Sequence, residues 1–380
     1  MSRTVSLVLV DPAGELLGRL PPFTVGVQWW QEVSDVVAGA GIDVTVLRLL
    51  HGDQAPPGGH VTYLAMTPDR PAGLLPAGVD LAPHPLRAAY AEPAGAAASL
   101  AWAAGALDRV GLSGLTARQQ RTWNLSAIWR FDGPDGVPAA WLKQVPPFFA
   151  HEAAVLRLIG EVAPDLVPHL LAAGDEGRAL IAHVPGEDRY GAPPSFRAEV
   201  LAALKPVQEH FAGRLPELRA AGVPEITLAR IFDIAKPYVS EMSGLAALLD
   251  DLPARLAAVD ECGLPDTLVH CDLHMGNVIS DGDSFTIVDW GDAAIGNPAF
   301  DAVRLPGEPE VLAAWAAQWP GGDALRAAEL LQPVESLRQA VVYDTFLAKI
   351  EPSEWPYHSD DVRRCLQTAV DLATEQAGNS

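Results

Sequence analysis

The sequence has few cysteines, no long apolar run and few basic residues, and each shortage excludes a class of protein. Its three cysteines, Cys262, Cys271 and Cys365, fit neither a disulfide framework nor a zinc pattern, so free thiols in a reducing compartment are expected. The apolar start ends at Asp11-Pro12, too early for a signal peptide, and no later segment reaches membrane-spanning length. A cytoplasmic protein without a membrane partner is therefore expected.

Basic residues are outnumbered, since 26 Lys and Arg stand against 48 Asp and Glu, and the formal net charge is −22. Nucleic acids and anionic membranes require clustered Lys and Arg, so neither is an expected partner. An acidic protein steers cationic substrates toward itself. The same acids equally serve to keep an Ala-rich protein soluble, and charge alone does not decide between these roles.

The length of 380 residues allows two or three domains with a large core. Hydrophobic periodicity predicts an α+β chain in four regions. These are a small α/β domain at 1–85, a linker and helix at 86–114, a small β-rich lobe at 115–186 and a mainly helical lobe at 187–380. In the first region, strands are expected at 4–10, 15–20, 43–50 and 60–65, and a helix at 29–38.

The order of elements in residues 1–85 loosely resembles part of a Nudix-like fold. The Gly- and Glu-rich box that binds metal in active Nudix hydrolases is absent from residues 33–44. A structural or substrate-capping role is therefore expected for this domain. Pro-, Ala- and Gly-rich residues then lead to a small-residue helix at 94–107. In the last region, helices are expected at 196–214, 226–242 with a break at Pro237, 245–259, 309–319, 323–350 and 359–377.

The most informative stretch is 268–301, in which two strands hold three oxygen-bearing side chains. His270 and Asp272 follow a short apolar strand, and Asn277 comes five residues after the aspartate. A hairpin turned at 281–283 then delivers Asp289. This pattern suits phosphoryl transfer: Asp272 would accept the proton of a substrate hydroxyl, and Asn277 and Asp289 offer the hard oxygen ligands that Mg²⁺ prefers.

The same stretch resembles the aminoglycoside phosphotransferase and choline kinase-like superfamily, through His270-x-Asp272-x-x-x-x-Asn277 and Ile287-Val-Asp289-Trp290. The resemblance implies a bilobal protein-kinase-like fold that the small α/β domain precedes. It implies that Asp272 is the catalytic base, that Asn277 and Asp289 are metal ligands, and that His270 is a buried support of the loop. ATP or GTP with Mg²⁺ would be the cofactor.

The nucleotide site is expected on the β-rich lobe. Lys143 lies in an apolar strand, where its charge needs a partner, and it resembles the ATP-phosphate lysine of the family. Glu152 is the candidate partner, and Glu161 is the fallback because Pro146-Pro147 shortens the interval. The chain has no Gly-x-Gly-x-x-Gly, so Asn124 and Ser126 would contact phosphate from the turn that takes its place.

In related kinases the backbone between the lobes binds adenine, which would place Ala182 to Val184 against the base. His183 is read as an ordinary histidine beside this hinge. The carboxy-terminal helices of related phosphotransferases build the acceptor pocket. Candidate pocket residues here, each equally readable as solvated surface, are Asp292, Asp344, Glu351, Glu354, Asp360, Trp355, Tyr357 and His358.

The combined prediction is an ATP- and Mg²⁺-dependent kinase for a hydroxyl of a small molecule, acting as a monomer or homodimer. An aminoglycoside, an amino sugar or a related secondary metabolite is the expected acceptor, because pocket acids would hold ammonium groups. Two alternatives stay open. The protein would phosphorylate a neutral metabolite or another protein, or it would be a catalytically silent nucleotide-binding regulatory module.

Overall fold

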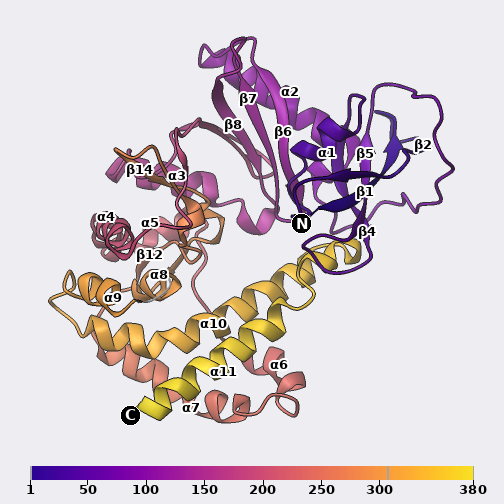
Figure 1. Ribbon diagram of the computed structural model, residues 1–380. Helices are drawn as coiled ribbons and strands as arrows, with labels where there is room; N and C mark the ends of the chain where they lie inside the picture. Colours follow the sequence, from indigo (N-terminus) through magenta and orange to yellow (C-terminus); the bar gives the residue numbers. More distant parts are fainter. Residues whose placement is uncertain (1, 306–307, 380) are drawn as a thin grey trace. The chain divides into compact units, whose positions relative to one another are not determined.

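The computed structural model describes residues 2–305 and 308–379, and it divides into two compact units (Figure 1). Unit 1 comprises Met1–Ala153, Leu170–His183 and Leu347–Ser359. Unit 2 comprises Ala154–His169, Val184–Phe346 and Asp360–Ser380. Unit 1 therefore contains the strand-rich amino-terminal part of the chain together with one short segment from near its carboxyl end.

The first sheet of unit 1 is a mixed five-stranded sheet. Its order is β2-β1-β5-β4, and β3 pairs with β1. Strands β1 and β5 run parallel, from Thr4 opposite His60 to Val10 opposite Met66. The four expected strands are thus confirmed, and β3 is an addition. The bounds are β1 Arg3–Val10, β2 Leu16–Arg19, β3 Phe23–Val25, β4 Thr45–Gly52 and β5 His60–Met66.

The helix expected at 29–38 is wrong over its first half, because α1 spans only Ser34–Gly39. Trp30 is fully buried, and its Nε1 donates to the Gly58 carbonyl at 2.6 Å. The Trp30 carbonyl accepts from the Tyr63 hydroxyl at 2.6 Å. These tertiary contacts hold the backbone around Trp30 in a turn, whereas the apolar spacing alone favoured a helix.

The second sheet of unit 1 also has five strands, in the order β6-β7-β8-β10-β9. Helix α2, Pro93–Arg109, packs on it, with Ala103, Ala106 and Leu107 in one core with Trp129 and Phe131. The small-residue helix expected near 94–107 therefore belongs to the core of this lobe. The strands are β6 Thr116–Trp123, β7 Ser126–Asp132, β8 Pro138–Gln144, β9 Leu170–Gly174 and β10 Arg178–Ala182.

The two sheets of unit 1 are joined by specific contacts. The Gln119 side chain pairs with the backbone of Val46, accepting from its N–H at 2.9 Å and donating to its carbonyl at 2.7 Å. The segment 347–359, which includes the 3-10 helix η6 Pro352–Tyr357, adds to the same core. The ring of Tyr357 meets Trp30 at 5.9 Å and Trp123 at 5.6 Å between centroids. Residues far apart in the sequence thus share one hydrophobic core.

Unit 2 is mainly helical, with two small sheets. Strand β12 pairs with β15, and β11, β13 and β14 form the other sheet. The strands are β11 Glu187–Asp188, β12 Thr267–Val269, β13 Val278–Ser280, β14 Phe285–Ile287 and β15 Ala294–Gly296. The helices, α3 starting in unit 1, are α3 Glu152–Val162, α4 Pro194–Ala212, α5 Leu215–Ala220, α6 Ile231–Ala235, α7 Leu245–Glu261, α8 Ala299–Arg304, α9 Pro309–Ala316, α10 Ala324–Lys349 and α11 Asp361–Asn379.

The long helix expected at 226–242 is wrong, since only α6 and the 3-10 helix η3, Lys236–Tyr238, form there. The Ile226 N–H donates to the Ile295 carbonyl at 3.0 Å, so the start of this stretch is extended against β15. Pro237 lacks a backbone N–H, and α6 ends two residues before it. The break expected at Pro237 is confirmed.

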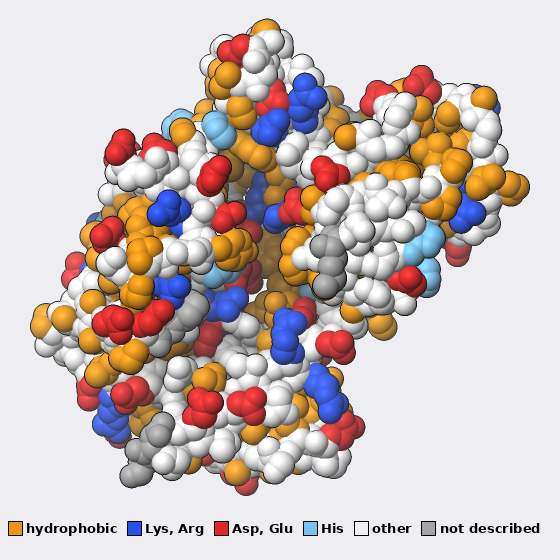
Figure 2. Space-filling view, in the orientation of Figure 1, with side chains coloured by type: hydrophobic (Ala, Val, Ile, Leu, Met, Phe, Trp, Pro, Cys, Tyr) orange, Lys and Arg blue, Asp and Glu red, His pale blue; other side chains and the backbone are white. Residues whose placement is uncertain are grey.

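Surface charge and helix hydrophobicity are the two features relevant to the partners expected from the sequence. On the face shown in Figure 2, acidic side chains are scattered singly or in small groups among neutral atoms. Charge on this face does not mark one region as the binding site. Within residues 2–305 and 308–379, no helix has both the length and the apolar content that a membrane span requires. All three cysteines are buried and free.

Candidate active site

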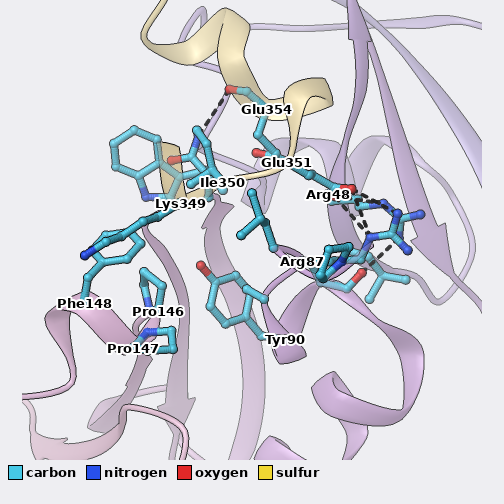
Figure 3. Close-up of a pocket in the computed structure, with 17 residues that line it drawn as sticks. Arg48, Arg87, Tyr90, Pro146, Pro147, Phe148, Lys349, Ile350, Glu351 and Glu354 are labelled. Atoms are coloured by element: carbon cyan, nitrogen blue, oxygen red, sulfur yellow. Dashed lines mark hydrogen bonds and ion pairs between the residues drawn. The ribbon is translucent and has the colours of Figure 1, made fainter. Parts of the chain in front are cut away.

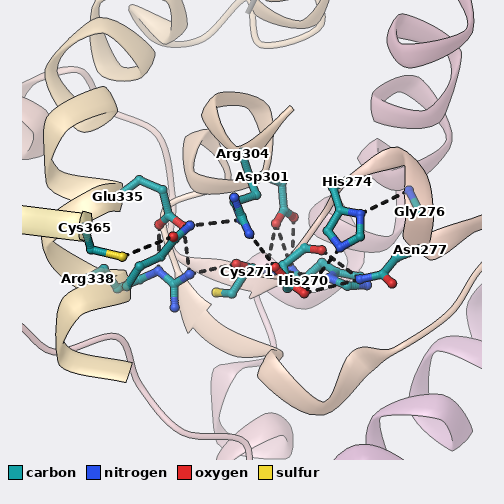
Figure 4. Close-up of polar contacts among 12 residues, drawn as sticks. His270, Cys271, His274, Gly276, Asn277, Asp301, Arg304, Glu335, Arg338 and Cys365 are labelled. Atoms are coloured by element: carbon teal, nitrogen blue, oxygen red, sulfur yellow. Dashed lines mark hydrogen bonds and ion pairs between the residues drawn. The ribbon is translucent and has the colours of Figure 1, made fainter. Parts of the chain in front are cut away.

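The loop that follows β12 is held by a buried carboxylate. Asp301, on α8, accepts hydrogen bonds from the backbone N–H of His270 at 3.0 Å and of Cys271 at 3.0 Å. The Gln208 side chain donates to the same carboxylate at 3.0 Å. Burial raises the pKa of Asp301 to about 6, although the backbone hydrogen bonds oppose the rise. This one side chain positions the backbone immediately before Asp272 (Figure 4).

His270 links the loop to the second half of the motif. It is fully buried, its Nδ1 accepts from the Asp272 N–H at 3.3 Å, and its Nε2 lies 3.0 Å from the Val288 carbonyl. Only a neutral ring with its proton on Nε2 satisfies both contacts. Burial lowers the pKa of His270, which agrees with a neutral ring. These contacts join the backbones on either side of the expected catalytic centre.

The Asp272 carboxylate lies in a polar cluster and its side chain is 30% exposed. Arg304 Nη2 donates to Asp272 Oδ1 at 2.6 Å. The Asn277 side-chain amide donates to the Asp272 carbonyl at 3.0 Å, with a longer contact of 3.4 Å to Oδ2. His274 Nε2 lies 3.7 Å from Oδ2. A partly exposed carboxylate with one oxygen held by a guanidinium is oriented to receive a proton on the other.

A buried ion pair on α10 also supports the loop. Arg338 donates to both oxygens of Glu335, at 2.6 and 2.7 Å, and its Nη2 also donates to the Cys271 carbonyl at 2.7 Å. Burial alone would lower the pKa of Arg338, but Glu335 holds it well above its ordinary value. Figure 4 shows this pair beside Cys271 and Arg304. The guanidinium therefore stays charged while fixing the loop backbone.

The backbone of the motif is strained at two points. Among the described residues, the non-glycine residues with positive φ are Glu176, Cys271 and Asp289, at 58°, 64° and 64°. A side chain in this region costs about 1–3 kcal/mol and persists where surrounding contacts hold it. Cys271 precedes Asp272 directly, and Asp289 is an expected metal ligand. Such strain is typical of functional sites.

The residues present fit a magnesium ion. Asn277 uses its amide nitrogen toward Asp272, so its oxygen is the atom suited to a cation. The Val288 N–H donates to the Asn277 carbonyl at 2.9 Å, which places the backbone of Asp289 beside that of Asn277. Within residues 2–305 and 308–379, no group of three or more His, Cys, Asp or Glu could hold a metal. The Asn277 amide oxygen and the Asp289 carboxylate would together suit magnesium, which keeps waters and phosphate oxygens as its other ligands.

The expected nucleotide residues lie in unit 1, apart from Val184, which unit 2 includes. Lys143 Nζ donates to Glu152 Oε1 at 2.7 Å, and Glu152 is 4% exposed. The lysine thus forms an ion pair with its first expected partner, whereas the fallback Glu161 is exposed farther along α3. The pair fixes the lysine amine on the sheet, as phosphate binding requires.

The residues of the expected phosphate turn have structural partners. Asn124 donates to the Glu354 carbonyl at 3.2 Å, and its Oδ1 lies 3.1 Å from His358 Nε2. The Ser126 hydroxyl accepts from Trp123 Nε1 at 3.1 Å. Contact of these side chains with phosphate stays a prediction.

At the expected hinge, Ala182 ends β10 and lies opposite Ala140 of β8. The next residue, His183, donates its N–H to the Ala139 carbonyl at 3.0 Å, and its Nδ1 accepts from Trp141 Nε1 at 3.0 Å. Burial lowers the pKa of His183. These contacts give His183 structural partners in the sheet, and its role beside a hinge stays a prediction. Adenine contact by Ala182 and Val184 stays a prediction.

The expected acceptor residues divide between the two units. Asp292 and Asp344 belong to unit 2, where Asp344 forms an ion pair with Arg230. The segment with Glu351, Trp355 and His358 belongs to unit 1. There Glu351 accepts from Arg87 at 3.0 Å, Trp355 donates to the Leu347 carbonyl at 3.0 Å, and His358 is buried. Their role in acceptor binding stays a prediction.

Sequence reasoning assigned no role to the residues that support the loop. Asp301 is the last residue of the stretch 268–301, and Arg304 lies three residues further along α8. Glu335 and Arg338 stand among the buried Leu331, Val334 and Leu337 of α10. A charged pair at i and i+3 on an apolar helix face is the signal that could have found them.

Unit 1 is rich in strands and unit 2 is mainly helical. Together with the loop that carries Asp272, Asn277 and Asp289, they define a phosphotransferase of kinase-like fold. Residues 2–331 match the model of the phosphotransferase enzyme family APH. The chain belongs to this family. No curated protein sequence gives a significant match.

Solved structures of the same fold include kinases of small molecules. Ethanolamine kinase from Plasmodium vivax is 12% identical, with a TM-score of 0.53 over 73% of this chain and 87% of that one. The GDP and kanamycin complex of APH(2")-IIia is 14% identical, with a TM-score of 0.52 over 73% and 99%. A choline/ethanolamine kinase family protein from Mesorhizobium loti is 17% identical, with a TM-score of 0.50 over 73% and 99%. These likenesses establish the fold.

Proposed function

We propose that the protein is an ATP- and magnesium-dependent kinase that transfers the γ-phosphoryl group to a hydroxyl of a small molecule. The observation that carries this proposal is the set of hydrogen bonds that position Asp272. Its backbone is held through Asp301 and His270, its carboxylate meets Arg304, and Asn277 is bonded to its carbonyl. Phosphoryl transfer depends mainly on such positioning, because the protein does little covalent chemistry itself.

Each residue has a defined part in the reaction. Asp272 takes the proton of the acceptor hydroxyl as the hydroxyl oxygen attacks the γ-phosphorus of ATP, and ADP leaves. Asn277 and Asp289 would hold magnesium, which when bound neutralises charge on the phosphate oxygens. Lys143, fixed by Glu152 at 2.7 Å, would bind the phosphates of the nucleotide. Arg304 keeps Asp272 in one rotamer through a charge-assisted hydrogen bond.

The acceptor class proposed is an aminoglycoside, an amino sugar or a related amine-bearing metabolite. The acidic balance of the chain and Asp292 in the motif support it. A structure of the same fold was solved with kanamycin. A neutral metabolite or a protein is the alternative acceptor, and a silent nucleotide-binding module is the alternative to an enzyme. Inhibition by polyamines would favour a cation site over a neutral one.

Residues 1–85 are proposed to form a non-catalytic domain with a Nudix-like order of elements. Its mixed sheet supports a structural or capping role, since the metal-binding box of active Nudix enzymes is absent from the sequence. A cytoplasmic location and a monomer or homodimer complete the proposal.

The test is transfer of labelled γ-phosphate from ATP with magnesium to a panel of aminoglycosides, amino sugars, neutral sugars and nucleosides. Asp272→Asn is the control, because it keeps the size and the Arg304 contact but removes the base. Transfer to one class, lost in the control with ATP binding unchanged, is expected. Full transfer by Asp272→Asn would refute the role of the base, and ATP binding without transfer to any acceptor would favour the silent module.

A further inference from the structure

Unit 1 contains a cavity of about 410 Å³ whose lining includes none of Asp272, Asn277, Asp289 and Lys143. Asn124, Glu351 and Glu354, which the sequence placed at the phosphate turn and in the acceptor pocket, do line it. All of its lining residues belong to unit 1. They come from β4, the connector at 85–91, the β6–β7 turn, the Pro146–Phe148 segment and the segment 349–354. Pockets of this volume with mainly apolar walls and a few polar atoms are typical of small-molecule sites.

Two buried polar atoms of the cavity wall are unsatisfied. Tyr90 and Glu354 are each 4% exposed and line the cavity. Within the described part of the chain, neither the Tyr90 hydroxyl nor Glu354 Oε2 has a hydrogen-bond partner. In Figure 3 the Tyr90 hydroxyl points into the space beside Pro146 and Pro147. Buried polar groups are nearly always bonded, so two orphans on one cavity indicate an occupant.

The two arginines of the wall are already paired and do not call for an anion, and Lys349 is exposed. Arg87 donates to Glu351 at 3.0 Å and to Glu92 at 2.5 Å. Arg48 Nε lies 3.5 Å from Glu351. Lys349 Nζ lies over the Phe148 ring, 5.5 Å from its centroid. The buried polar groups left to meet a ligand are therefore the tyrosine hydroxyl and the glutamic acid.

Both of these groups act as donors at neutral pH. Burial raises the pKa of Glu354 to about 8, so the uncharged acid predominates. Its Oε1 accepts from the Leu49 N–H at 2.8 Å, which leaves the proton on Oε2. Burial also raises the pKa of Tyr90, so the phenol keeps its proton. Two O–H donors among Trp123, Phe148 and proline rings match an oxygen acceptor on an apolar body.

We propose that this cavity binds an uncharged small molecule that presents a carbonyl or hydroxyl oxygen from an apolar ring to Tyr90 and Glu354. The site lies within unit 1 and its binding does not depend on phosphoryl transfer. The walls also include Pro146 to Phe148, and α3 with Glu152 begins shortly after them. Such a ligand would thus contact the segment that leads to the partner of Lys143.

The test measures binding of cyclohexanone to the full chain by saturation-transfer NMR. Cyclohexylammonium and cyclohexanecarboxylate are matched probes with the same ring and opposite charges. Cyclohexanone alone is expected to bind, with at least a five-fold weaker Kd in Tyr90→Phe and no binding in the cavity-filling Ala88→Trp. Tyr238→Phe, in unit 2, is the matched control and should bind as the parent does.

Unchanged melting temperatures in Tyr90→Phe and Tyr238→Phe would establish that both variants are folded. Absence of cyclohexanone binding, or equal affinity in Tyr90→Phe, would overturn the proposal. Preferential binding of either charged probe would overturn the ligand class. The measurement is repeated with saturating AMP-PNP and magnesium. Persistence of binding is expected, and displacement would assign the cavity to the nucleotide site instead.

Discussion

Asp301 makes the stability of the protein depend on pH in an unusual direction. Its pKa is raised from 3.8 to about 6 because the carboxylate is fully buried. The folded protein therefore binds a proton more tightly than the unfolded chain does. The contribution of the protonated acid is fully present below about pH 4 and is lost as the pH rises through about 6. A shift of about 2 units corresponds to about 3 kcal/mol.

Asp301→Asn removes this titration and keeps an oxygen for the N–H groups of His270 and Cys271. The free energy of unfolding of the parent, relative to that of the variant, should fall by about 2–3 kcal/mol between pH 4 and pH 7. Urea unfolding followed by tryptophan fluorescence measures it, since Trp290 lies 4.5 Å from the His270 ring between centroids. Taking the difference cancels titrations that the two proteins share.

Asp301→Ala is the complementary variant, since it leaves two loop N–H groups without an acceptor. Each buried, unsatisfied donor costs about 1–3 kcal/mol, so a loss of about 2–6 kcal/mol at every pH is expected. A difference between parent and Asp301→Asn that does not change with pH would show that Asp301 titrates normally. The conclusion that burial raises the pKa of the carboxylate that holds the loop would then be wrong.

Three further predictions concern single side chains. Asp289→Ala should weaken binding of magnesium–ATP at least about tenfold by calorimetry, and unchanged affinity would remove it from the metal site. Arg304→Gln loses a charged hydrogen bond of about 1.5–3 kcal/mol, so kcat should fall about 10- to 100-fold with nucleotide Kd unchanged. Loss of nucleotide binding as well would contradict a role confined to Asp272. Glu354, with a pKa raised to about 8 by burial, destabilises the protein as the pH rises from about 4.5 to about 8. In Glu354→Gln this loss of stability, about 5 kcal/mol at most, should disappear when melting temperature is measured against pH. The same dependence on pH in parent and variant would refute the raised pKa of Glu354.

The placing of the motif residues on a loop and a short hairpin could be predicted because it is encoded locally. Asp272, Asn277 and Asp289 lie within 18 consecutive residues, and a hairpin of two short strands separates the last two. Lys143 and its partner Glu152 are likewise close in sequence. A single lysine in an apolar strand demands a nearby acid, and the pair follows from that demand.

The support of the site could not be predicted in the same way. Arg338 reaches the Cys271 carbonyl across 67 residues of sequence, and Gln208 reaches Asp301 across 93. Periodicity identifies a buried helix face but does not tell which loop it faces. The wrong helix around Trp30 has the same origin, since its backbone bonds to Tyr63 rather than to its own neighbours. In both regions tertiary contacts, rather than local sequence preference, determine the structure.

Removing residues 1–80 tests whether the amino-terminal sheet is a separable cap. If it is a cap, its loss should change acceptor affinity more than ATP hydrolysis, and equal loss of both would make it a requirement for folding. The core of that sheet includes Tyr357 and packs against Trp123, and Gln119 of β6 pairs with Val46 of β4. Deletion would expose these apolar rings and leave a buried amide unpaired.

We therefore expect the truncated protein to lose ATP binding and acceptor turnover together, with a lower melting temperature. Gln119→Ala is the milder variant, since it removes only one of the contacts between the sheets. It should cost about 1–3 kcal/mol of stability while leaving nucleotide affinity intact. A truncated chain that melts like the parent and still hydrolyses ATP would show that the sheet is an independent cap. The shared core around Tyr357 would then be dispensable to the fold of unit 1.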